Sequence, residues 1–141
     1  MLYSRPNIFV KKYGGWGPFL IRVATGFHLA YGMIDNIINR ERMQAFIKYL
    51  YELGVSIPTL TAYSSAYVQF IGGILFILGY YQRTSAFVMM VHFIFVILIA
   101  HVGDTYQHLF PALFMLIAST SLFFSGPGKF AIDNLKRKRK N

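Results

Sequence analysis

The four histidines are the side chains of this 141-residue chain best suited to chemistry, because it has no cysteine and few carboxylates. His28 and His92 both fall inside apolar segments. At 1.5 Å of rise per residue, they lie about 15 Å and about 12 Å from the starts of their predicted helices. Similar depth on two helices is what a bis-histidine b-type haem needs, but haem also requires a wide apolar slot that aromatic side chains can fill. We therefore favour structural, hydrogen-bonded histidines over haem, with proton transfer or ligand contact left open.

A polar stripe continues from His28 along the same segment. At 100° per residue, His28, Tyr31, Asp35 and Asn39 fall within one arc of a helix. Polar groups at membrane depth cannot face lipid cheaply, so we expect this stripe to face the other helices. Arg22 lies elsewhere on the helix, near the predicted cytoplasmic end, where its side chain can reach the headgroups. The candidate ligand-binding residues are His28, Tyr31, Asp35, Gln69 and His92.

A weaker candidate metal site lies around a turn near the predicted outer surface. His101, Asp104 and His108 are of metal-binding types, but their spacing matches no recognised signature, and polar residues at such a turn usually meet water. His92 and His101 are nine residues apart, so on a straight helix they point to opposite sides and are not expected in one site. No residue is predicted to be catalytic.

The elements that position these residues are long apolar helices. Only 13% of the residues are charged, and no Asp, Glu, Lys or Arg occurs within 53–82, 84–103 or 105–128. A helix needs about 20 mostly apolar residues to cross a bilayer, and a soluble domain of this size could not bury three such segments. The sequence predicts an all-α, antiparallel bundle of four transmembrane helices, at about 18–38, 59–80, 84–102 and 107–124.

Two further patterns refine this architecture. Between the first two spans, apolar residues at helical spacing alternate with charged ones, which predicts a short amphipathic helix at about 41–53 on the outer membrane surface. In the second span, small and polar residues share one face that would let a neighbouring backbone approach closely, and Phe76 continues it. These residues are Ser65, Gln69, Gly72 and Gly73.

The distribution of positive charge predicts the orientation. With the N-terminus inside, ten Lys and Arg residues flank the inner ends of the spans and three flank the outer ends, which favours both termini inside. The net charge of +9 is concentrated beyond the last span, so we expect contact with lipid headgroups rather than nucleic acid. Residues 1–17 are interpreted as a cytoplasmic interfacial segment, 18–128 as the membrane domain and 129–141 as a cytoplasmic tail. Its candidate headgroup-binding residues are Lys136, Arg137, Lys138, Arg139 and Lys140.

The chain resembles the DoxX family of small bacterial membrane proteins over about 19–133. The similar stretches are Leu20-Ile21-Arg22-Val23-Ala24-Thr25-Gly26, Leu53-Gly54-Val55-Ser56-Ile57-Pro58, Gln69-Phe70-Ile71-Gly72-Gly73 and Gly126-Pro127-Gly128-Lys129-Phe130-Ala131-Ile132-Asp133. Two positions depart from the family pattern. Asp35 stands where relatives often have lysine, and Gln69 where they commonly have glutamate.

The resemblance implies a four-helix membrane bundle in the bacterial cytoplasmic (inner) membrane. Some relatives are subunits of membrane redox complexes, including thiosulfate:quinone oxidoreductases. The leading hypothesis is a non-catalytic, accessory subunit of a quinone-linked membrane redox complex. Quinone is a candidate ligand of the face that carries His28, Asp35 and Gln69, and the cofactor is left open. Two alternatives remain: a carrier or binding protein for a lipid or small hydrophobic solute, and a structural subunit of a larger complex. The implied partners are the bilayer and either another membrane protein or further copies of this chain.

Overall fold

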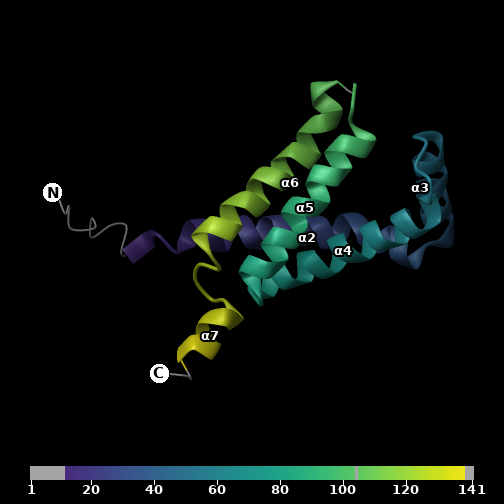
Figure 1. Cartoon of the computed structure of the whole chain (residues 1–141). Helices are drawn as coiled ribbons and strands as arrows, with labels where there is room; N and C mark the ends of the chain where they lie inside the picture. The colour runs from purple at the N-terminus through teal and green to yellow at the C-terminus, as the bar shows by residue number, and fades with distance from the viewer. Residues whose placement is uncertain (1–11, 104, 139–141) are drawn as a thin grey trace.

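The computed structural model describes residues 12–103 and 105–138, and every regular element in these ranges is an α-helix (Figure 1). The first five helices begin and end within two residues of the predicted ranges, whereas α7 lies where the sequence predicts only a basic tail. The helices are α2 (Trp16–Ile38), α3 (Arg40–Glu52), α4 (Pro58–Leu78), α5 (Gln82–Ala100), α6 (Tyr106–Ser125) and α7 (Ile132–Lys138).

Local sequence signals determine where these helices begin and end. Asn39 has an extended backbone between α2 and α3, and its side chain accepts a 2.9 Å hydrogen bond from the Glu41 amide, which caps α3. Pro58 occupies the first turn of α4, where a missing amide hydrogen costs little. Gly79 ends α4 with φ of 62°, a left-handed conformation that glycine adopts without steric cost.

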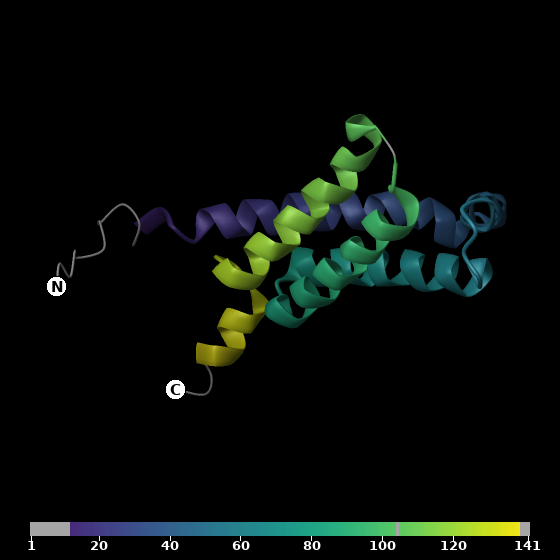
Figure 2. The same ribbon diagram turned by 45° about the horizontal axis from the view of Figure 1, so that its top comes forward.

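The helices form two antiparallel pairs that meet at one end and spread at the other. α2 lies against α4, and the α5–α6 pair crosses them obliquely, as two views show (Figures 1 and 2). α3 lies across the far end of the α2–α4 pair. An apolar core that includes Leu29, Phe76 and Met89 joins the two pairs, and a second cluster fixes α3 through Met43 and Leu50. The pairs therefore enclose a wedge-shaped space on the α3 side of the main core.

The predicted small-and-polar face of α4 is buried. Its five residues, Ser65, Gln69, Gly72, Gly73 and Phe76, all lie inside the structure. Gly73 contacts α2 at Gly26, where neither helix has a side chain to separate the two backbones. This face is the main packing surface between α4 and its neighbours.

The expectation that the polar stripe of α2 faces the other helices is wrong for three of its four residues, all except His28. Tyr31 is 71% exposed, and Asp35 and Asn39 are exposed as well. The buried face of α2 consists instead of Arg22, Thr25, Gly26 and Leu29. The close backbone approach at Gly26 sets the rotation of α2, and this turns Tyr31, Asp35 and Asn39 outward.

Arg22 does not extend toward headgroups, as the sequence suggested, but is completely buried. One guanidinium nitrogen, Nη1, donates to the carbonyl oxygens of Phe76 (3.0 Å) and Ile77 (2.8 Å) in the last turn of α4. The other, Nη2, donates to those of Lys129 (2.9 Å) and Phe130 (3.0 Å). Last-turn carbonyls lack partners within their own helix, so the planar, five-donor guanidinium is well suited to join them to a second segment.

Asp133 completes this junction between helix ends. Its carboxylate accepts hydrogen bonds from the backbone amides of Tyr81 (2.9 Å) and Gln82 (2.8 Å) at the start of α5. A negative charge is favourable at a helix N-terminus. The contact also holds Tyr81 at φ of 47°, an uncommon conformation for a residue with a side chain. Residues 129–133, which follow α6, are thus hydrogen-bonded to α2 and to the start of α5.

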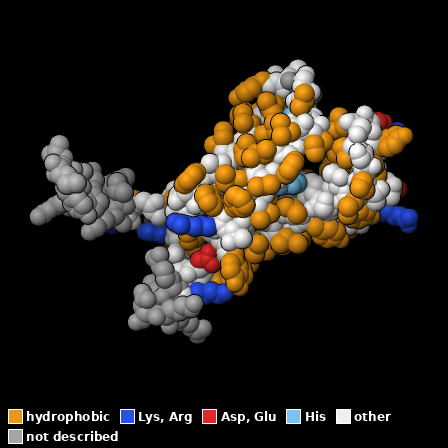
Figure 3. Space-filling model, in the orientation of Figure 1, with side chains coloured by type: hydrophobic (Ala, Val, Ile, Leu, Met, Phe, Trp, Pro, Cys, Tyr) orange, Lys and Arg blue, Asp and Glu red, His pale blue; other side chains and the backbone are white. Residues whose placement is uncertain are grey.

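The outer surfaces of α4, α5 and α6 are apolar. Each of these helices is long and apolar enough to cross a membrane by length and composition. Large exposed apolar side chains such as Ile71, Phe95 and Phe114 cover them, and the space-filling view shows this over the α5–α6 pair (Figure 3). Such a surface is stable in lipid and would be unstable in water.

Candidate functional site

A cavity of about 650 Å³ occupies the wedge between the two helix pairs, below α3. All four histidines contribute to its lining, and one is visible in the hollow beside α3 (Figure 3). Its walls are mainly apolar and come from the five helices α2 to α6 and from His101, which follows α5. Representative lining residues are Leu29 and Met33 of α2, Phe46 of α3, Val68 of α4, Phe93 of α5 and Met115 of α6.

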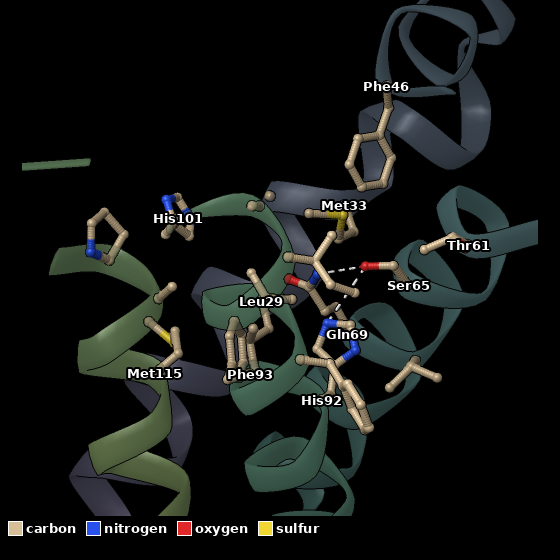
Figure 4. A pocket seen from close by; sticks show the side chains of 18 of the residues that line it. Leu29, Met33, Phe46, Thr61, Ser65, Gln69, His92, Phe93, His101 and Met115 are labelled. Carbon is tan, nitrogen blue, oxygen red and sulfur yellow. Dashed lines mark hydrogen bonds between the residues drawn. The ribbon is translucent and has the colours of Figure 1, made fainter. Parts of the chain in front are cut away.

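A small hydrogen-bonded group of polar side chains interrupts this apolar lining. Gln69 donates from Nε2 to the hydroxyl oxygen of Ser65 over 3.2 Å, and this hydroxyl lies 3.5 Å from Nε2 of His92 (Figure 4). Gln69 and Ser65 are one turn apart on α4 and both are buried, while His92 is half-buried on the facing α5. We call these three residues the polar triplet. It presents amide, hydroxyl and imidazole groups to the cavity without a formal charge.

The cavity contains no Lys, Arg, Asp or Glu among its described lining residues. Burying a charged ligand group in such surroundings without an oppositely charged partner is costly. A ligand with an apolar body and a neutral group that forms hydrogen bonds is therefore favoured over an anionic headgroup. The arrangement can bind and orient such a molecule.

The structure places three of the five candidate ligand-binding residues in the cavity lining and two outside it. His28, Gln69 and His92 line the cavity. Tyr31 and Asp35 lie outside the lining, and Tyr31 instead stacks on Phe27, with ring centroids 5.8 Å apart.

His92 and His101 line the same cavity, although nine residues separate them. The expectation that they cannot share a site is wrong because α5 ends at Ala100. His101 has a non-helical backbone there (φ −123°, ψ 12°), so the helical geometry that would point it away does not apply.

His108 also lines the cavity, at the start of α6, while Asp104 lies outside the described residues. In the part of the chain that the structure describes, no three His, Asp or Glu side chains come close enough to hold a metal ion. For the headgroup candidates, the structure shows that Lys136 donates to the hydroxyl of Tyr80 over 2.9 Å. Arg139 and Lys140 lie outside the described residues.

Two residues that matter were not identified as site residues from the sequence. Ser65 precedes Gln69 by one helical turn on the predicted polar face, and this spacing could have identified it as a partner. The role of Arg22 had no such signal, because its four acceptors are backbone carbonyls from two distant segments.

Apolar helices of spanning length around a largely apolar cavity define a multi-pass helical membrane protein. The sequence model of the DoxX family matches residues 17–102, from the start of α2 to the end of α5. The chain therefore belongs to the DoxX family. No curated protein and no solved structure matches it.

Proposed function

We propose that this DoxX-family protein binds a quinone in the cavity and acts as an accessory subunit of a membrane redox complex. The observation that carries the proposal is the uncharged polar triplet within an otherwise apolar cavity. A quinone has an apolar body and two carbonyl oxygens that accept hydrogen bonds. Gln69 and His92 can each supply a donor, depending on the tautomer of the imidazole.

The size and chemistry of the cavity support a neutral ring compound. A volume of about 650 Å³ is within the usual range for small-molecule sites, which combine apolar walls with a few polar groups that orient the ligand. The lack of charged groups among the described lining residues disfavours a phospholipid headgroup. Other neutral amphiphiles share this chemistry. We choose quinone because some members of the family are subunits of quinone-linked redox complexes. Catalysis would then belong to a partner subunit.

The proposal includes a topology of four spans, with α2 as the first and both termini in the cytoplasm. α2 has 23 residues, enough to cross the hydrocarbon core, and both terminal guanidinium nitrogens of its buried Arg22 are hydrogen-bonded to backbone carbonyls rather than exposed to lipid. The excess of positive charge at the inner ends supports this orientation. The membrane would be the bacterial inner membrane, with the cavity in its outer half.

A ligand-retention and binding experiment tests the function. The purified protein in lipid nanodiscs would be extracted with solvent for mass spectrometry, and a quinone with one prenyl unit would be titrated by calorimetry. We expect quinone to co-purify, and we expect Gln69→Leu or Ser65→Ala to weaken binding by about tenfold, since one lost hydrogen bond of about 1.4 kcal/mol has this effect.

Matched controls separate the site from general effects. Ser121→Ala on α6 and Asp35→Asn on α2 change polar residues outside the cavity lining, and both should leave binding unchanged. Stoichiometric recovery of a phospholipid or another solute in place of quinone would favour the carrier hypothesis. An empty cavity together with a tightly bound larger protein would favour the structural one.

A further inference from the structure

A second groove, of about 580 Å³, begins where the cavity ends. It lies between the first turn of α4, the last turn of α5 and the α3–α4 connection. Thr61 of α4 and Ile99 of α5 line both the groove and the cavity, so the two spaces adjoin at this pair. The remaining groove residues are Leu53, Gly54, Val55, Ser56, Ile57, Leu60 and Leu98.

The shared pair lies at a gap between two diverging helices. α4 and α5 are joined by a short turn at their other ends and spread apart toward α3 (Figure 1). Beside the gap, Leu60 is 64% and Leu98 61% exposed, and Ile99 is 42% exposed. These exposed apolar side chains belong to two helices of membrane-spanning length, so the groove lies between the cavity and their apolar outer surface.

We propose that this gap is a lateral portal, through which the apolar chain of the cavity ligand extends into the outer leaflet. The inference rests on the proposed function and specifies its ligand as a quinone with a long isoprenoid chain. The ring lies at the polar triplet, and the chain passes between Thr61 and Ile99 to contact Leu60 and Leu98. A short, compact solute would use the cavity alone and leave the groove to lipid.

The shared lining of the two spaces by Thr61 and Ile99 carries this argument. A ring and a short linker fill only part of 650 Å³, but an isoprenoid chain of many units cannot fit there as well and must leave the cavity. The groove, with Leu60 and Leu98 beside the gap, provides an exit for such a chain toward the exposed apolar surfaces of α4 and α5.

Photocrosslinking tests the path of the chain directly. A long-chain quinone with a diazirine at the end of its chain would be bound to the wild-type protein in nanodiscs, illuminated and mapped by peptide mass spectrometry. We expect labels on the peptides that contain Leu60 and Leu98, and we expect unlabelled long-chain quinone to remove them. Labels on α2 and α6 instead, or no labels above background with binding retained, would overturn the portal.

Blocking the gap provides an independent test that does not require a label. Leu98→Trp places a large ring in the groove at a residue outside the cavity lining, whereas Ile117→Trp enlarges a similarly exposed residue of α6 outside both spaces and is the matched control. In Leu98→Trp we expect affinity for the long-chain quinone to fall at least tenfold, with affinity for the one-prenyl quinone changed less than twofold. Equal losses for both quinones would overturn the portal and leave the cavity site intact. If the wild-type protein bound neither quinone, the proposed function would fail, and the portal with it.

Discussion

Gly26 and Gly73 bring the backbones of α2 and α4 into direct contact. A Cβ atom on either glycine would lie 2.6 Å from the carbonyl oxygen of the other, which is closer than such atoms can approach. Each position also faces a backbone nitrogen of the opposite helix, Ile77 for Gly26 and Ala30 for Gly73. Because these are backbone atoms, they cannot rotate away as a flexible side chain would. The pair determines how closely α2 and α4 pack.

Substitution of Gly26 by alanine should therefore destabilise the protein. The added methyl group forces the two helices apart, and overpacking of this kind costs about 1–3 kcal/mol. Gly32→Ala on the same helix is the matched control, because its Cβ would meet no atom within 4 Å. It should be neutral or stabilising by up to about 1 kcal/mol through higher helix propensity. Unfolding of both variants in mixed detergent, monitored by circular dichroism, would measure the two changes in stability. Equal effects at Gly26 and Gly32 would contradict the backbone contact between α2 and α4.

Replacement of Arg22 by lysine should lower the stability of the protein nearly as much as replacement by methionine. Lysine keeps the charge but cannot reach four carbonyl oxygens in two segments with one ammonium group. We expect a loss of about 3 kcal/mol in the free energy of unfolding. Arg83→Lys, at an exposed position, should change stability by less than about 0.5 kcal/mol. A fully stable Arg22→Lys variant would show that charge alone is enough.

Asp133→Ala should weaken the start of α5. Two backbone amides lose their acceptor, and a lost helix cap costs about 1–2 kcal/mol. Asp133→Asn keeps one acceptor oxygen but no negative charge, so its loss should be smaller. Hydrogen exchange of the Tyr81 and Gln82 amides reports on this site directly. Exchange there should speed up in Asp133→Ala and stay unchanged in Asp35→Ala, which alters an exposed carboxylate.

Lys136 and Tyr80 should titrate as partners. The hydrogen bond from the ammonium group lowers the pKa of Tyr80, and the same contact raises the pKa of Lys136. Lys136→Met removes the cation that favours the phenolate, so the pKa of Tyr80 should move upward. The chain has ten tyrosines, so the signal of Tyr80 must be isolated. Subtracting the ultraviolet titration curve of the matching Tyr80→Phe variant from that of each protein leaves the titration of Tyr80 alone. An unchanged midpoint would rule out the contact in solution.

The proposed topology can be tested with single cysteines, since the chain has none of its own. Ser56→Cys lies between α3 and α4 and Arg83→Cys at the first turn of α5, and both positions are exposed. A membrane-impermeant maleimide added to intact spheroplasts should label Ser56→Cys at once and Arg83→Cys only after lysis. The reverse pattern would invert the orientation, and labelling of both would contradict the span count.

The helices could be predicted from the sequence because their signals are local. Charge-free stretches, Pro58 and Gly79 mark the ends of helices without reference to the rest of the fold. The small-and-polar face of α4 could be predicted for the same reason, since one-turn spacing places its residues together.

What could not be predicted depended on contacts between distant segments. The rotation of α2 follows from one backbone contact with Gly73, and helical periodicity alone favoured the polar stripe instead. The burial of Arg22 depends on carbonyls more than 50 and more than 100 residues away, which no local pattern identifies. His101 joined the cavity because α5 ends one residue before it.

The hydrogen bonds of Arg22 have a consequence for biosynthesis. Two of its acceptors, at Lys129 and Phe130, follow it by 107 and 108 residues. At typical translation rates the ribosome reaches them about 5–20 s after it has made the arginine. A nascent chain that ends before that point would have only two of the four acceptors of this guanidinium, so the packing of α2 at Arg22 is completed only near the end of synthesis.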